Sequence, residues 1–142
     1  LAHYSSCYLA PHYSHLIGES NMNFKQRLEA CLLGLITLFA DDETPLGCLM
    51  IKSLNESDSA VFSEEVTNYI REVSVESTQV FIALFTSEIA PKDIPENTTI
   101  ETMVNYVLSV VYGLAVQARV GQAEEALKAI VIYTLDLLPN GK

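Results

Sequence analysis

The segment Gly113-Leu-Ala-Val-Gln-Ala-Arg119-Val-Gly121-Gln-Ala-Glu-Glu-Ala-Leu-Lys128 decides how this chain folds. It predicts one apolar helix that ends at Gly121 and a second helix that begins almost at once. Glycine suits the left-handed residue that closes a helix, and Arg119 lies where a cation favours the negative end of the helix dipole. Glu124 and Glu125 fall in the first turn of the second helix, where the dipole favours anions. We therefore expect two long helices joined by a very short turn.

The rest of the chain follows the same helical pattern. Its 142 residues suit a single domain, and 49% of them are apolar, which excludes a disordered chain. The five prolines and six glycines cluster at breaks between long periodic segments. The sequence therefore predicts an all-α domain of about six helices, near residues 1–10, 23–40, 46–55, 63–85, 99–120 and 123–138.

The net charge of −10 limits the partners of the chain. An acidic surface repels phosphate, so the chain alone suits neither nucleic acid nor an anionic membrane surface. No uninterrupted apolar run approaches the roughly 20 residues of a membrane span. Three cysteines form an odd number without metal-type spacing, so a reducing cytoplasm is the simplest setting.

The last two predicted helices carry more apolar surface than one core face requires. Each has a second apolar stripe besides the one expected to face the core, and too few other helices remain to cover both. We therefore expect two copies of the chain to associate, two helices from each forming a four-helix bundle about a two-fold axis. The alternative is burial at the centre of a single domain. The expected homodimer interface comprises Val110, Gly113, Gln117, Ala126, Ala129, Tyr133 and Leu137.

Two motifs together resemble the ligand-binding domain of TetR-family transcriptional repressors. Many members carry a Pro-x-Gly-Cys-x-x sequence before a short central helix, as in Pro45 to Met50 here. Many also end with a Gly-Leu-x-x-x-x-Arg-x-Gly junction and an acidic helix start, as in Gly113 to Glu125. The resemblance covers essentially the whole chain in the number, order and length of its helices.

The family's DNA-binding head is not represented in these residues. Members begin with three helices that include a helix-turn-helix, whereas Leu1 starts without a methionine or a helix cap. We expect residues 1–142 to be the effector-binding and dimerisation domain of a longer protein whose basic head precedes Leu1. The resemblance then implies operator DNA as a partner only through that head. It also implies release from DNA when a small ligand enters the body.

A ligand cavity is expected between the central helices, with mainly apolar walls. Such walls suggest a hydrophobic or aromatic effector and no cofactor. Core packing is the competing interpretation for the apolar residues, and a bond back to its own helix is the competing one for Ser77. The candidate ligand-binding residues are Cys31, Leu35, Phe39, Leu49, Ser53, Val73, Ser77, Phe81, Met103 and Tyr106.

Other chemistries find little support. His3, Cys7, His12 and His15 could approach one another, but Pro11 interrupts them, so surface or linker positions are favoured over a metal site. A redox-active cysteine needs nearby cations or a helix N-terminus; cations are sparse here and only Cys48 could lie near a helix start, so small core positions are favoured for Cys31 and Cys48. No glycine-rich phosphate loop, Gly-x-Ser-x-Gly or paired His-Glu motif indicates an enzyme. The main alternative function is a helical interaction module that dimerises without a ligand.

Overall fold

The computed structural model describes residues 21–40 and 64–141, which form four α-helices and one short 3-10 helix. The helices are α3 (Phe24–Ala40), α5 (Glu64–Glu88), α6 (Ile100–Arg119) and α7 (Glu124–Leu137), with η2 at Pro91–Asp93. No strand occurs within these ranges, so the predicted all-α class is confirmed. The predicted segments near residues 1–10 and 46–55 lie outside the described residues, and the expected count of six helices therefore stays a prediction.

Helix α3 begins with a reciprocal cap. The Asn23 side-chain oxygen accepts the backbone N–H of Gln26 at 2.9 Å, and the Gln26 side-chain oxygen accepts the N–H of Asn23 at 3.0 Å. This capping box satisfies two N–H groups that a helix start otherwise leaves without partners. Thr99 caps α6 in a similar way, because its hydroxyl accepts the N–H of Thr102.

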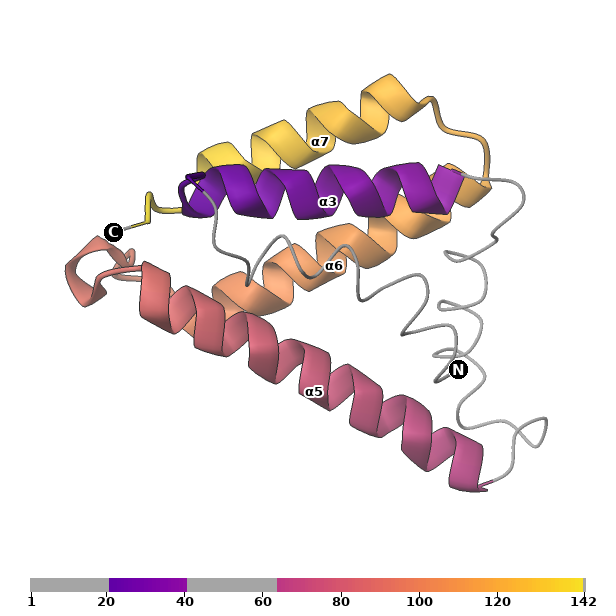
Figure 1. Cartoon of the computed structure of the whole chain (residues 1–142), viewed down its shortest axis with the longest axis horizontal. Coiled ribbons are helices and arrows are strands. Elements are labelled where there is room, and N and C mark those ends of the chain that lie inside the picture. The colour runs from indigo at the N-terminus through magenta and orange to yellow at the C-terminus, as the bar shows by residue number, and fades with distance from the viewer. Residues whose placement is uncertain (1–20, 41–63, 142) are drawn as a thin grey trace.

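The junction between α6 and α7 has the predicted glycine closure. Gly121 has a φ of 90°, the left-handed conformation that glycine adopts without strain. Its N–H donates to the Ala118 carbonyl, and the N–H of Gln122 donates to the Gln117 carbonyl. These two bonds make a Schellman motif, which satisfies the last carbonyls of α6. Helix α7 then starts at Glu124 without a side-chain cap, and the two helices run antiparallel (Figure 1).

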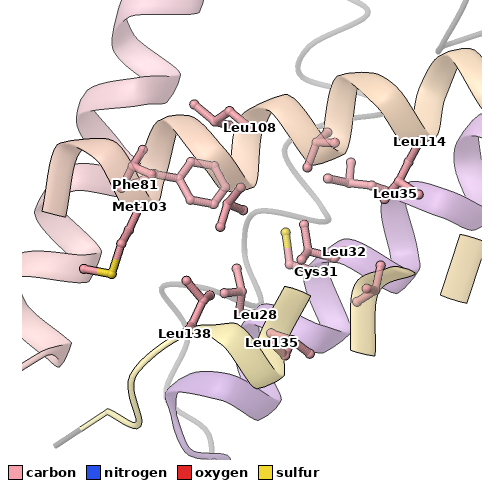
Figure 2. Packing of buried hydrophobic residues seen from close by; sticks show 14 of the residues in the cluster. Leu28, Cys31, Leu32, Leu35, Phe81, Met103, Leu108, Leu114, Leu135 and Leu138 are labelled. Carbon is pink, nitrogen blue, oxygen red and sulfur yellow. The ribbon is translucent and has the colours of Figure 1, made fainter. Parts of the chain in front are cut away.

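Helix α6 is the centre of the described fold. It packs against α3, α5 and α7, and α3 also packs against α7 (Figure 1). One face of α6 is buried along almost its whole length, as the predicted stripe requires. The close view in Figure 2 shows how the three other helices supply the facing side chains. The buried residues of α6 are Met103, Val104, Val107, Leu108, Val111, Leu114 and Ala115.

One end of the helix assembly, here called the closed end, joins three distant parts of the chain. The Phe24 ring meets the Phe85 ring edge to face, with centroids 5.2 Å apart. Arg27 Nη2 lies 2.7 Å from Glu88 Oε1, and both side chains are largely shielded from solvent. A Cβ placed on Gly141 would lie 2.6 Å from the Cβ of Phe24, so the C-terminal segment lies directly against the start of α3.

Helix α5 departs from the sequence prediction in two respects. It continues three residues beyond Phe85, to Glu88. The spacing of apolar residues in this segment predicts that Val80 shares a face with Phe81, but Val80 is exposed. Phe81 and Phe85 together define the buried side, and Val80 lies about 100° from Phe81 around the helix axis.

By length and composition alone, α6 could cross a membrane, although the sequence contains no uninterrupted apolar run of that length. Core helices of globular domains pass the same test. Here α6 packs against three neighbouring helices, which accounts for one side of its apolar surface.

The Schellman closure can be tested with Gly121→Ala. An alanine at φ 90° is strained, so we expect the free energy of unfolding to fall by about 1 kcal/mol. Gly121→Asn is the matched control, because asparagine adopts the left-handed conformation with less strain than alanine. Denaturant unfolding at fixed protein concentration should show a smaller loss of stability for Gly121→Asn than for Gly121→Ala. Equal effects would mean that the left-handed turn is not required.

Candidate functional site

The predicted site residues that the structure describes fall on two sides of α6. One group consists of buried residues on α3, α5 and α6 and is here called the inner wall: Cys31, Leu35, Phe81 and Met103. The other group lies mainly on the exposed side of α6 and α7 and is here called the outer face, although its Val110 is half-buried and packs against the core. It comprises Tyr106, Val110, Gly113, Gln117, Ala126, Ala129, Tyr133 and Leu137.

The inner wall is apolar and closed to solvent in the chain described. Cys31 is fully buried, and Met103, the most exposed member, is only 7% exposed. Figure 2 shows Phe81 reaching from α5 toward α6, with Cys31 on α3 and Leu35 beside Leu114. These four described side chains offer shape and apolar contact and carry no charge.

Cys31 is a neutral thiol at physiological pH. Burial raises the pKa of the Cys31 thiol to about 12, because the thiolate cannot be solvated there. A thiol that keeps its proton is neither an effective nucleophile nor a metal ligand. Among the described residues, no group of three or more His, Cys, Asp or Glu could hold a metal ion.

Several predicted ligand residues cannot be placed as side chains. Phe39 belongs to α3, and Val73 and Ser77 belong to α5, but their side chains lie outside what the structure describes. Leu49 and Ser53 fall in the segment between the described ranges. Their roles in ligand binding stay predictions.

Tyr106 is separated from the inner wall. It is 41% exposed and lies on the outer face with Val110 and Gly113, whereas Met103 is buried. Its predicted ligand contact remains untested, and its position suits an association surface better.

Along α6 the outer face is uncharged and mainly apolar, with Gln117 as its polar member. Between Glu101 and Arg119 the helix contains no charged residue, although much of this side is open. On α7, Tyr133 is 64% exposed, and Leu137 is also exposed one turn further along. Isolated apolar residues are normal on a protein surface, but a continuous apolar stripe on two adjacent helices indicates a covered surface.

Two further exposed apolar residues extend the outer face beyond the prediction. Val116 and Val120 lie near the C-terminal end of α6, three and seven residues after Gly113. The sequence contained this signal, because residues three and seven apart share a helix face. The prediction continued from Gly113 to Gln117, and counting three residues from Gly113 as well as four would have found Val116 and then Val120.

The comparisons with known proteins agree with this architecture. No family model and no curated protein matches the chain. A solved structure of the TetR family transcriptional regulator CifR is similar to it, with a TM-score of 0.65 and 25% sequence identity. The match covers 97% of this chain and 70% of that one. That protein is a cysteine mutant complexed with a 26-bp double-strand operator DNA. The predicted TetR resemblance and TetR-like helical fold are thereby confirmed.

The buried thiol gives a pH dependence that can be measured. The thiol loses its proton above pH 9.0 in the unfolded chain and only near pH 12 in the folded chain. Between these values the unfolded state binds fewer protons, so the free energy of unfolding falls as pH rises, by at most about 1.4 kcal/mol per pH unit. Below pH 9 the contribution of the protonated Cys31 thiol to the free energy of unfolding is fully present.

The variant Cys31→Ala isolates this effect from tyrosine and lysine titration. Denaturant unfolding of the parent and the variant should show a stability difference that is constant from pH 7 to 8.5 and shrinks above pH 9. A difference that stays constant up to pH 10.5 would show that the Cys31 thiol ionises as easily in the folded chain as in the unfolded one.

Proposed function

We propose that this chain is the effector-binding and dimerisation body of a TetR-like transcriptional repressor, working in the cytoplasm and without catalytic activity. The observation that carries the proposal is the likeness to CifR over 97% of the chain. That likeness supports a transcription regulator rather than an enzyme. A helix-turn-helix head outside these residues would supply the operator contacts, in keeping with the net charge of −10.

The outer face supports association of two copies. A surface that one chain leaves apolar on two adjacent helices can be covered by the same surface of a second copy, which is the isologous contact of a two-fold dimer. Gly113 adds no side chain at its position, and Ala126 and Ala129 add little, so helices can approach closely there. Two copies would together form a four-helix bundle from α6 and α7.

The inner wall supports a neutral hydrophobic or aromatic effector. Its described members offer methyl, thioether, thiol and ring surfaces and no charge. A charged ligand would lose its hydration without gaining a partner there. An apolar ligand would gain about 25 cal/mol for each Å² removed from water.

The two surfaces share α6, which offers a route from ligand to DNA. A dimeric repressor holds two recognition helices about 34–36 Å apart, to match successive major grooves. A ligand that binds one arrangement of the inner wall more tightly favours the dimer shape compatible with that arrangement. Switching from 1:99 to 99:1 needs a difference of about 5.5 kcal/mol in binding free energy.

A ligand-free dimerisation module is the second candidate function. The observation that favours it is the dense packing of the inner wall side chains, which a simple core also requires. The two functions share the outer face and differ in whether any compound stabilises the chain.

The dimer can be tested with Tyr133→Glu. A carboxylate at the centre of the outer face would be desolvated in the dimer without a partner, so we expect at least a tenfold loss of association. Sedimentation velocity should show dimers for the parent and monomers for the variant at the same concentration. Val75→Glu is the matched control, because Val75 on α5 is 55% exposed and lies off the outer face. Monomers with Val75→Glu, or dimers with Tyr133→Glu, would place the interface elsewhere.

The effector can be tested by thermal shift with neutral aromatic and aliphatic compounds. Binding to the folded state alone adds about 2.7 kcal/mol of stability when the ligand is at 100 times its Kd. We expect at least one compound to raise the Tm of the parent. We also expect Phe81→Leu to reduce that shift, because it alters the inner wall.

Leu127→Val is the control for the effector test. Leu127 is equally buried but lies on α7, outside the inner wall. It should lower the Tm without removing the ligand-induced rise. A full panel without any shift would favour the ligand-free module.

A further inference from the structure

We propose that α5 pivots about the closed end, and that the Arg27–Glu88 ion pair is a clasp that sets its angle to α3. This device goes beyond the proposed effector and dimer roles, because it is a property of the ligand-free single chain.

The closed end supplies a pivot point. The edge-to-face contact of Phe24 and Phe85 joins the start of α3 to the last turn of α5, and both rings are buried. Ile89, directly after α5, is buried as well. An aromatic contact of this kind tolerates small rotations, because its attraction varies gently with the angle between the rings.

The ion pair fixes the angle between α3 and α5, which the ring contact alone does not fix. Arg27 lies one turn after Phe24 on α3, and Glu88 lies one turn after Phe85 on α5. Two cross-links one turn apart define the relative direction of two helices, whereas one cross-link defines only a point. The pair is 14% and 25% exposed, so solvent screens it less than an open surface pair.

Helix α5 leaves α3 as it runs away from the closed end. Figure 1 shows α5 diverging from α3 toward Glu64, so that the two helices separate with distance from the closed end. The side chains that the structure describes between Glu64 and Glu76 are all exposed. Among the described parts, α5 packs mainly against α6. The buried side chains that the structure describes on α5, Phe81 and Phe85, lie in its C-terminal third.

The length of α5 amplifies a small rotation at the clasp. From Phe85 to Glu64 the helix extends about 32 Å, so a rotation of roughly 5° moves the far end by about 3 Å. A shift of that size is comparable to those that helices make in ligand-controlled switches. Because the inner wall includes Phe81 on α5, the same rotation would change the wall's shape.

Pulsed electron spin resonance can measure this angle. One spin-label pair, Thr37→Cys with Glu72→Cys, reports the open end, where α5 has diverged from α3, and a second pair, Lys25→Cys with Ser87→Cys, reports the closed end. Lys25 is half-buried and the other three positions are exposed. Cys7 and Cys48 are replaced by serine, buried Cys31 is kept, and excess unlabelled chain ensures that both spins belong to one copy.

Breaking the ion pair should change the distance distribution at the open end only. We expect Arg27→Gln to widen the open-end distance distribution at least twofold while the closed-end distribution keeps its width, and Glu88→Gln to do the same. The charge exchange Arg27→Glu with Glu88→Arg should restore the narrow distribution. Lys128→Gln, which removes the exposed Glu124 and Glu125 pairs on α7, is the control and should change neither distribution.

Two outcomes would overturn the proposal. Unchanged open-end width in both single variants would show that the clasp does not set the angle. Equal widening of both distance distributions, in a variant whose helix content is unchanged by circular dichroism, would show that the ion pair holds the closed end together and does not set the direction of α5. Neither outcome depends on finding an effector or a dimer.

Discussion

The burial of one face of α6 against three other helices is the constraint on which the described fold depends. Met103 to Ala115 bring that face into contact with α3, α5 and α7. Because a helix has two sides, burying one side fixes where the other points. The same packing that makes the core therefore directs Tyr106 and Gly113 outward. Core and association surface are two consequences of one helix position.

Local chemistry made the helix boundaries predictable. The Asn23 and Thr99 caps and the Gly121 closure act within a few residues, so the ends of α3, α6 and α7 lie within one or two residues of the prediction. The exposure of Val80 could not be predicted in this way. It depends on which side of α5 meets α6, and thus on the angle between distant helices. The ligand roles of the inner wall are also beyond sequence reasoning, because an apolar stripe looks the same in a core and in a binding site.

The inner wall combines tight packing with an absence of charge. Cys31, its most polar described member, keeps its proton because burial disfavours the thiolate. Recognition by such a wall would rest on volume and shape, which an apolar pocket discriminates only modestly: one methylene is worth about 1–3 kcal/mol. A regulator built on it would respond to a class of related compounds rather than to one. Its selectivity would then depend on side chains from the segments that join the described helices.

The Schellman turn at Gly121 has a consequence for how the sequence can change over time. Surface connections usually accept added or lost residues. One residue added between Arg119 and Gly121 would instead break the two hydrogen bonds of this turn, which join Gly121 to Ala118 and Gln122 to Gln117. The direction in which α7 leaves α6, and with it the burial of Leu127, depends on that turn. Substitutions on α6 and α7 can accumulate one at a time, whereas a change in the length of the turn alters these contacts together. The connection from Ile89 to Thr99 does not join two helices of the outer face, so its length has more freedom to vary.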